Sequence, residues 1–405
     1  MLVKIAWRNI WRNKVRSLVV IIALALGLWA GTFASGFYEG MMKQKINDVI
    51  QSEMSHLQVH DTLFREEMLT KYFMHDATSI EQEIAQDRTV LGTTGRVVVM
   101  AMMGSANKNG GVKMIGINPE DESKVTGLNE KVIEGEYFEG IKRNPILISQ
   151  KMAENYKLKL RSKVVLTVQD LEGEIVAASF RVVGIYKSGN GMVDEVNAYV
   201  ERSDVQRMLS IESDDYHEIA VLLNENDIAE SKAAEFQKAF PNLEVKPWLD
   251  LAAGMRYMVE AGQTFSLIIV AIILIALLFS VINTMLMAVM ERTKEIGMLM
   301  AIGLNRTKVF SMIMLETIFL SLIGGPLGLL VAYLFISTTG KNGIDLGAQG
   351  EAYSEMGFAA VVYPELGIET YIIITVMVLV MALIAAIYPA RKALKLNPSE
   401  AIRKI

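Results

Sequence analysis

The stretch FSLIIVAIILIALLFSVI, Phe265–Ile282, decides the class of this protein. Fourteen of its eighteen residues are Leu, Ile, Val or Phe, and none is charged. At about −0.3 to −0.6 kcal/mol for each of these side chains, the run favours insertion into a bilayer by roughly 6 kcal/mol. Because a helix of about 20 apolar residues crosses the hydrocarbon core, the stretch predicts a membrane-spanning helix over 265–289.

The rest of the chain favours a membrane protein over a soluble enzyme. Of its 405 residues 52% are hydrophobic, and the mean hydropathy is positive, which is unusual for a soluble chain. A buried helix of a soluble protein is therefore the weaker interpretation of the opening stretch. Segments long enough to span a bilayer predict four transmembrane helices, at 17–37, 265–289, 309–336 and 368–387.

The distribution of basic residues predicts the orientation. Residues 1–16, an amphipathic segment, carry five Lys or Arg and no acid, and the 290–308 loop and the 388–405 tail are also rich in Lys and Arg. By contrast, residues 337–367 carry one Lys and four acids. The positive-inside rule then places both termini and the 290–308 loop in the cytoplasm, and residues 38–263 and 337–367 outside. We expect the first span to be an uncleaved anchor, because its apolar run is too long for the usual core of a cleavable signal peptide.

Residues 38–263 are predicted to fold as a large α+β domain outside the membrane, because short strand-like runs alternate there with turn signals. The expected strands are MSHLQVH (54–60), GRVVVMAMMG (95–104), GGVKMIGI (110–117), PILIS (145–149), KVVLTVQDLEGEIVAASFRVVGIY (163–186), EVNAYV (195–200), HEIAVLL (217–223) and NLEVKPW (242–248). The expected amphipathic helices are Ser79–Gln86, Gln150–Tyr156 and Ile228–Phe240.

The order of these elements predicts two subdomains. Residues 38–118 and 215–263 form a split α+β subdomain, and residues 119–214 form an inserted β-rich one that contains a flexible loop, SGNGM, at 188–192. Helix-compatible sequence without proline follows the first span and precedes the second. We therefore expect a helical stalk at these two connections instead of the Gly-, Ser- or Pro-rich composition of a flexible linker.

The sequence carries no recognisable catalytic constellation. It has no cysteine, which excludes disulfides, thiolate metal sites and cysteine nucleophiles. It contains no G-x-x-x-x-G-K-[ST], G-x-S-x-G or H-E-x-x-H motif. Two of its four histidines, His56 and His60, are spaced for one helix face, but HLQVH alternates like a strand. We expect a non-catalytic chain with no cofactor or metal of its own and no nucleic-acid partner.

Four residues inside the predicted spans call for a structural explanation. Asn283 is expected to join helices by a hydrogen bond. Glu316 lies near the start of the third span, where a carboxylate is costly and faces protein or water. A structural role is preferred for it over a proton or substrate role. In GGPLG (324–328), Gly324 permits close helix approach, and Pro326 is expected to kink the span.

The loop between the second and third spans begins with the charged run ERTKE, Glu291–Glu295, and continues as IGMLMAIGLN. This stretch predicts a short amphipathic helix that ends at Gly303 and is too short to span a bilayer. The apolar residues that share one face are Ile296, Leu299, Met300 and Ile302. Such a helix can rest on lipid headgroups or dock into a groove of a soluble partner, and the pattern alone leaves both open.

The segment NTMLMAVMERTKEIGMLMAIGLNRTKVF, Asn283–Phe310, resembles the permease signature of the MacB/FtsX/LolC-LolE group of ABC transporters. In that group an E-R-x-x-E-I-G-x-x-x-A-x-G segment is the coupling helix, which docks on the ATPase. The matching residues are Glu291, Arg292, Glu295, Ile296, Gly297, Ala301 and Gly303, with Leu299 on the same helix. The tail YPARKALKLNPSEAIR is similar to the end of the family's chains at Pro389, Ala390, Pro398 and Ala401.

The resemblance implies a MacB-like permease fold: four spans and a large periplasmic domain after the first. It also implies a mechanotransmission transporter in the inner membrane. Two copies of a separate cytoplasmic ABC ATPase subunit would bind ATP and Mg²⁺, and a second permease copy or a paralogue would complete the complex.

Within the group, the segments ASGFYEGMMKQKI, MIGINPEDESKV and ILISQKMAENYKLKLRSKVVLTV are similar to lipoprotein-releasing permeases. The resemblance then implies a lipoprotein substrate, surrounded by membrane lipids and passed to a periplasmic acceptor. A substrate cavity would involve Phe33, Phe37, Phe265 and Ile268. Two alternatives stay open: MacB-like efflux of hydrophobic compounds or peptides, and FtsX-like regulation of cell-wall hydrolases without transport.

Overall fold

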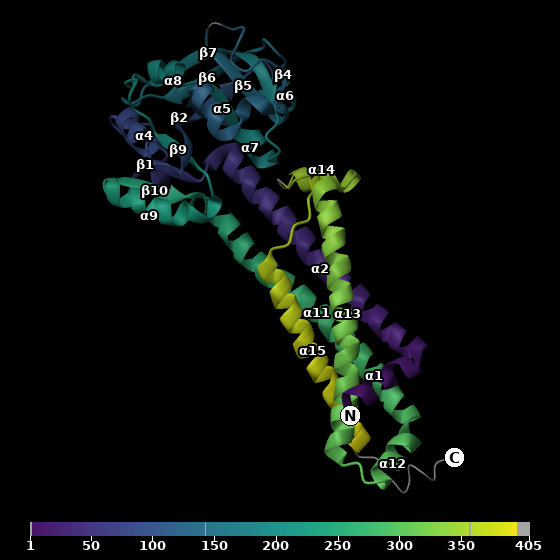
Figure 1. Ribbon diagram of the computed structural model, residues 1–405. Helices are drawn as coiled ribbons and strands as arrows, with labels where there is room; N and C mark the ends of the chain where they lie inside the picture. The colour runs from purple at the N-terminus through teal and green to yellow at the C-terminus, as the bar shows by residue number, and fades with distance from the viewer. Residues whose placement is uncertain (1, 142, 356–357, 395–405) are drawn as a thin grey trace. The chain divides into compact units, whose positions relative to one another are not determined.

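The computed structural model describes residues 2–141, 143–355 and 358–394. They divide into two compact units (Figure 1). The first, which we call the α+β domain, comprises Lys43–Met258 and Leu346–Ala360. The second, the membrane unit, comprises the remaining described residues. Pro398 and Ala401 of the predicted tail lie outside the described residues.

Four helices are long and apolar enough to cross a membrane. They are α2 (Lys14–Val49), α11 (Ala253–Glu291), α13 (Arg306–Asn342) and α15 (Ile368–Leu394). The prediction of four such helices beside an α+β domain is confirmed. Each helix continues beyond its predicted span at one end or both, because the flanking polar residues are also good helix formers.

Glycines let the helices of the membrane unit approach closely. A Cβ added at Gly27 of α2 would lie 2.7 Å from the Leu277 side chain of α11. Gly324 and Gly328 of α13 face α2 in the same way, and a Cβ at Gly328 would lie 2.7 Å from the Ala25 carbonyl oxygen. Since lipid tails are as apolar as leucine, close packing of this kind is a main source of stability for membrane helices.

Short elements complete the membrane unit and the segment that precedes α15. They are α1 (Leu2–Arg12), α12 (Thr293–Ala301), α14 (Ala348–Glu355), and a two-stranded sheet of β11 (Ile344–Asp345) and β12 (Val361–Val362). Helix α1 is amphipathic, because Ala6 and Ile10 are buried while Trp7 and Trp11 are exposed. The Trp7 ring packs edge-to-face against Phe319 of α13, with ring centroids 5.8 Å apart.

A ten-stranded mixed sheet forms the core of the α+β domain, in the order β10-β1-β9-β2-β3-β8-β5-β7-β4, with β6 paired to β2 and β7. The strands are β1 (Leu57–Asp61), β2 (Val90–Gly104), β3 (Asn109–Ile117), β4 (Val132–Gly135), β5 (Pro145–Ser149), β6 (Lys163–Gln169), β7 (Ile175–Tyr186), β8 (Asn197–Glu201), β9 (Glu218–Leu223) and β10 (Leu243–Pro247). The helices are α3 (Phe64–Glu67), α4 (Ala77–Ala85), α5 (Pro119–Thr126), α6 (Gln150–Tyr156), α7 (Gly191–Val196), α8 (Arg202–Leu209), α9 (Ala229–Ala239) and α10 (Trp248–Leu251).

Strand β2 belongs to both parts of the domain. Its first half pairs with β9 up to Arg96, and its second half pairs with β3 from Val97 onward. The hydrophobic clusters change along the same strand, since Val97 and Val99 pack with the insert while Val90 packs with β1 and β9. The two parts therefore divide within β2 and not at residue 119, because one long strand can pair with different partners along its length.

Local capping changes the expected loop at 188–192. The Asn190 side chain accepts a hydrogen bond from the Met192 backbone N–H at 3.2 Å and starts α7 there. Helix α7 runs to Val196, so β8 begins at Asn197 and not at the expected residue 195. An asparagine directly before a helix caps its first turn, because its side chain accepts a backbone hydrogen bond there. The alternation of apolar and polar residues, which predicts strands, does not show such a cap.

A fully buried ion network lies where the two parts of the α+β domain meet. Arg96 of β2, only 2% exposed, donates to both carboxylate oxygens of Glu122 in α5 at 2.7 and 2.9 Å. It also donates to Glu218 of β9 at 2.7 Å. Burial alone would raise the pKa of Glu218, but the bond to His60 and the charge of Arg96 outweigh burial and lower this pKa to about 2.

Candidate functional site

The elbow between α11 and α12 contains the charged residues of the predicted coupling motif. Helix α11 ends at Glu291 and α12 begins at Thr293, and Arg292 between them has φ −99° and ψ 18°, outside helical geometry. The Thr293 hydroxyl donates to the Met290 carbonyl at 2.6 Å and satisfies an acceptor at the end of α11. The chain turns here, and a new helix starts at once.

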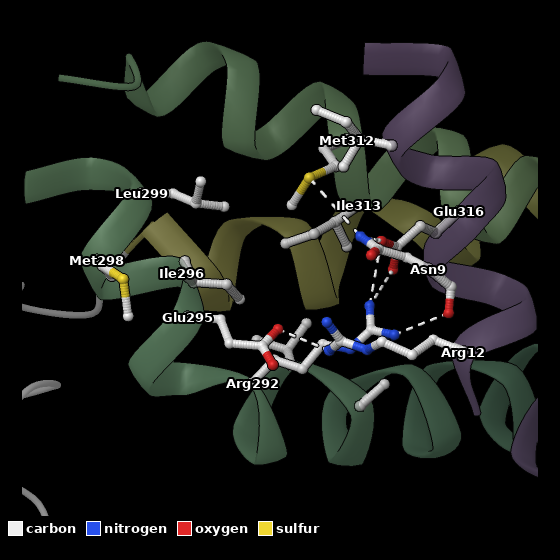
Figure 2. A pocket seen from close by; sticks show the side chains of 13 residues that line it. Asn9, Arg12, Arg292, Glu295, Ile296, Met298, Leu299, Met312, Ile313 and Glu316 are labelled. Atoms are coloured by element: carbon white, nitrogen blue, oxygen red, sulfur yellow. Dashed lines mark hydrogen bonds and ion pairs between the residues drawn. The ribbon is translucent and has the colours of Figure 1, made fainter. Parts of the chain in front are cut away.

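The Arg292 side chain points into the membrane unit (Figure 2). Its Nη1 donates to the two carboxylate oxygens of Glu316 in α13 at 3.3 and 3.4 Å, and its Nη2 donates to the Asn9 carbonyl of α1 at 2.8 Å. The Asn9 amide in turn donates to Glu316 at 2.6 Å. Because the side chains of Arg292 and Glu316 are only 14% and 9% exposed, the three residues form a largely buried junction of α1, the elbow and α13.

Two further ion pairs flank this junction. Arg12 of α1 donates to Glu295 of α12 at 2.6 Å, and Arg16 of α2 is hydrogen-bonded to Glu291 at the end of α11. Both pairs are open to solvent at one partner or both, so each adds little free energy alone. Their position matters more, because residues 9–16 contact every charged residue of the matched motif.

One face of α12 turns toward the membrane unit. Ile296 is 3% exposed and packs in the main hydrophobic cluster, and Gly297 is buried beside it. Leu299 lines a cavity of about 270 Å³ between α1, α11, α12 and α13, together with Ile5 and Ile313 (Figure 2). Among the predicted coupling residues, Ile296, Gly297 and Leu299 therefore pack within this chain.

The opposite face of α12 is exposed. Met298, which also borders the cavity, is 54% exposed, and Ile302 just after the helix is 78% exposed. Lys294 and Ala301 are exposed as well. Gly303 follows with φ 101°, a conformation that favours glycine and ends the helix. The structure thus divides the predicted coupling residues into a packed set and an exposed set.

The predicted substrate-cavity residues fall into two places. Phe33 of α2 packs on Trp29, on Phe37 and on Phe335 of α13, and the Phe33 and Phe335 centroids are 5.1 Å apart. Phe265 of α11 is instead 56% exposed. No ring contact joins it to Phe33 or Phe37 in the described part of the chain.

Ile268, also on α11, is 48% exposed like Phe265. Asn283 of α11 is exposed as well, and its side chain makes no hydrogen bond in the described part of the chain, so it does not join two helices of this chain. Pro326 lies within α13, which continues through it as one helix. Among the residues predicted in the spans, Glu316 and Gly324 make the close contacts.

The sequence interpretation missed Asn9, Arg12 and Arg16 as site residues. It used the basic N-terminal segment only as a signal of orientation. The sequence held a further signal for Asn9. Ala6 and Ile10 lie on one apolar face of α1, and Asn9 lies at the border of that face. The partners of Arg12 and Arg16, however, lie 283 and 275 residues away in the chain, and no local pattern identifies them.

Two family models match this chain. Residues 17–239 match the family model of the MacB-like periplasmic core domain, and residues 267–398 match that of the FtsX-like permease C-terminal region. The lipoprotein-releasing system transmembrane protein LolC of Neisseria meningitidis is 24% identical over 335 residues, 78% of each chain.

Two other relatives match shorter parts. An uncharacterized ABC transporter permease of Methanocaldococcus jannaschii is 28% identical over 231 residues, and the chain spans about half the length of that relative (55%) and matches it over 55% of its own. The macrolide export ATP-binding/permease protein MacB of Escherichia coli is 30% identical over 142 residues, 34% of this chain and 20% of that one.

Proposed function

This chain belongs to the FtsX/MacB/LolC family of ABC transporter permeases, and on that premise we propose that it is the membrane subunit of a mechanotransmission transporter. Two copies of a separate cytoplasmic ATPase subunit bind and hydrolyse ATP with Mg²⁺. Their closure pushes α12, and the motion passes to the α+β domain. A second copy of this chain, or a paralogue, completes the complex, and this chain performs no chemical step.

The exposed face of α12 carries the proposal. Met298 on the nine-residue helix α12 and Ile302 directly after its end are large apolar side chains that are more than half exposed. A short helix that offers such a face suits a groove on a partner protein, and methionine adapts to the shape of that groove. The basic residues of 1–16 and 290–308 support a cytoplasmic location for this face.

Continuous helices support transmission of the motion. Helix α11 has 39 residues and α2 has 36, so at 1.5 Å per residue they are roughly 58 and 54 Å long. The hydrocarbon core is about 30 Å thick. Close to half of each helix therefore extends beyond it as the expected stalk, and an unbroken helix transmits a displacement better than a flexible linker does.

For the cargo we propose lipoproteins, which are extracted from the inner membrane and passed to a periplasmic acceptor. The relative named for lipoprotein release matches over 78% of each chain, whereas the macrolide exporter matches over 20% of its own length. Phe265 and Ile268 are exposed on α11 and available to acyl chains. Phe33 and Phe37 contribute less, since their rings already pack on one another and the Phe33 ring also packs on Phe335 of α13.

The docking face is tested with Met298→Asp and Ile302→Asp in the full chain co-expressed with its ATPase. A carboxylate in an apolar groove costs several kcal/mol, so we expect ATPase capture to fall at least tenfold while membrane insertion stays normal. Leu91→Asp, at a position of the α+β domain that is 66% exposed, is the matched control. Normal capture by both α12 variants would refute the docking face.

Orientation has its own test. A single thiol introduced as Lys294→Cys is unique, because the chain has no cysteine. We expect a membrane-impermeant maleimide to leave it unlabelled in intact cells and to label it in inverted vesicles. Labelling from the cell exterior would make contact with a cytoplasmic ATPase impossible.

The cargo is tested by depleting the protein and separating the membranes. We expect lipoproteins to accumulate in the inner membrane. Normal lipoprotein sorting with increased sensitivity to hydrophobic compounds would favour efflux instead. Normal sorting with altered cell-wall hydrolysis would favour a regulator of the FtsX type.

A further inference from the structure

The three charged residues of the matched motif, Glu291, Arg292 and Glu295, bond to residues of this chain. Arg292 bonds to Glu316 and to the Asn9 carbonyl, while Glu291 and Glu295 pair with arginines of the N-terminal segment. The exposed face consists instead of Met298, Ile302 and their neighbours. The charged and apolar parts of the motif therefore have different contacts.

We infer that Asn9, Arg292 and Glu316 form an elbow anchor that fixes the start of α12 to α1 and α13. These three are positioning residues of the coupling unit and do not contact the ATPase. The inference rests on the proposed role of α12 as the coupling helix. It assigns a mechanical task to α1, which the sequence pattern predicts only as part of a cytoplasmic amphipathic segment.

The anchor is needed because α12 acts as a lever. Its nine residues extend roughly 13 Å from the elbow. The exposed Met298 lies in its second turn, and Ile302 lies directly after its last residue. A push on these side chains turns α12 about its first residue. If the elbow were free, the non-helical break at Arg292 would absorb the displacement. A fixed elbow passes the force to α11 and, through Glu316, to α13.

The cavity behind α12 supports this assignment. It occupies about 270 Å³ beside Leu299 and Ile313 and opens to the surface of the membrane unit. The outer part of α12 thus has room to move while the elbow stays bonded. A binding site for a charged ligand is a poorer explanation, because Arg292 and Arg12 at the polar end of the cavity are already paired with carboxylates.

The ion pairs at the elbow differ in how far they are exposed to solvent, so a buried pair and an exposed pair can be compared by mutation. Arg292 and Glu316 are 14% and 9% exposed, and removing one partner leaves the other charge buried without compensation. Arg12 and Glu295 are each 51% exposed, so water replaces a lost partner. Variants of Arg292 or Glu316 should release the elbow, and Arg12→Gln should not.

The first experiment uses the full-length permease alone in lipid nanodiscs. Hydrogen exchange of the backbone amides at 292–296 is compared among wild type, Glu316→Gln, Arg292→Met and Arg12→Gln. We expect at least tenfold faster exchange at the elbow in the first two variants and no change in the third. Equal exchange in all four proteins would overturn the anchor, whatever the fate of the proposed function.

The second experiment adds the ATPase subunit. We expect Glu316→Gln to capture ATPase normally but to lower the ATP turnover of the complex about tenfold, with KM for ATP unchanged. Loss of capture would instead show that the anchor residues contact the ATPase, which overturns the inference. Normal turnover with normal capture would also overturn it but leave the coupling-helix assignment intact.

A covalent cross-link between α1 and α12 distinguishes loss of positioning from misfolding as the cause of the Glu316→Gln defect. Arg12→Cys with Glu295→Cys introduces the only two thiols in a cysteine-free chain, at side chains that bond at 2.6 Å. A short bismaleimide then ties α1 to α12 in the Glu316→Gln background. We expect turnover to recover at least fivefold on cross-linking. A cross-linked protein that stays inactive would refute the anchor.

Discussion

An arginine with little exposed surface pairs with carboxylate in both units, and its surroundings differ. Arg96 in the α+β domain is 2% exposed and donates three bonds of 2.7 to 2.9 Å to two carboxylates. Arg292 in the membrane unit is 14% exposed and lies 3.3 to 3.4 Å from one carboxylate. The first arginine joins a strand, a helix and a second strand inside a continuous sheet. The second holds a junction between two helices.

The difference shows how one chemical pair can serve two purposes. Short bidentate bonds without water fix a single geometry, which suits the point where β2 passes from one part of its domain to the other. Longer bonds near water tolerate small displacements, which suits an elbow under load. The predictions below test this contrast in order of decreasing effect.

The largest effect is expected from Arg96→Met. Two buried carboxylates, Glu122 and Glu218, would lose their shared partner, and breaking a buried pair costs about 3–5 kcal/mol of unfolding free energy. Arg292→Met should cost less, about 1.5–3 kcal/mol, as for hydrogen bonds to a charged group. Hydrogen exchange resolved by unit measures both in the same protein. Equal losses of unfolding free energy in the two variants would contradict the expected difference between Arg96 and Arg292.

The exposed pair of Arg256 and Asp250 supplies the control for that measurement. Both side chains are about two-fifths exposed, at 42% and 39%. Water therefore solvates the carboxylate after Arg256→Met, and exchange should stay at the wild-type rate. A loss as large as that of Arg96→Met would show that burial is not the cause.

The next largest effect is expected from lowering the pH, which should destabilise the α+β domain more than the membrane unit. Burial lowers the pKa of His217 from 6.5 to about 4, and its Nε2 lies 2.9 Å from the Thr70 carbonyl. The unfolded chain takes up a proton below pH 6.5 and the folded domain only near pH 4, so stability is lost as pH falls between these values. The loss is about 3 kcal/mol. Hydrogen exchange from pH 7 to 4 should accelerate in the α+β domain.

The membrane unit should respond less over the same range. All four histidines of the chain lie in residues 43–258, within the α+β domain, and burial lowers the pKa of His56 there as well. In His217→Gln the pH dependence should become shallower. A membrane unit that loses as much stability as the α+β domain would contradict this explanation.

The smallest effect is expected from helix caps. Asn118 accepts a bond from the Glu120 backbone N–H at 3.1 Å at the start of α5, the helix that carries Glu122. Asn118→Ala should destabilise the domain by about 1 kcal/mol. The corresponding bond of Asn305 at the start of α13 is longer, 3.4 Å, so Asn305→Ala should cost less. Thermal unfolding of the two variants in the same nanodiscs compares them, and a larger loss for Asn305→Ala would reverse the expected order.

Much of the fold followed from local pattern. The run PILIS is β5 at the predicted residues, and HEIAVLL contains β9, because each is a short apolar run bounded by turn residues. The short strand β4 (Val132–Gly135) was missed, since VIEG is too brief to show alternation. The short helix after the charged run was predicted to end at Gly303, and α12 ends close by, at Ala301.

The candidate site was predictable only in part. The motif identified the elbow and α12, but it did not separate the residues that pack inward from those that are exposed. Asn9 bonds to Glu316 across 307 positions of the chain. Neither residue carries a local signal for the other, so no period or spacing predicts the contact.

The sequence by itself determined that four helices are long and apolar enough to cross a membrane, that an α+β domain lies between the first two, and that a short charged and apolar segment follows the second. These properties depend on transfer free energies and on periodicity, which act over neighbouring residues. Only the tertiary structure decided that β2 serves both parts of its domain and that Arg292 turns inward to Glu316. Those outcomes depend on which distant groups meet when the helices and strands pack, because a buried charge is stable only where its partner lies within reach.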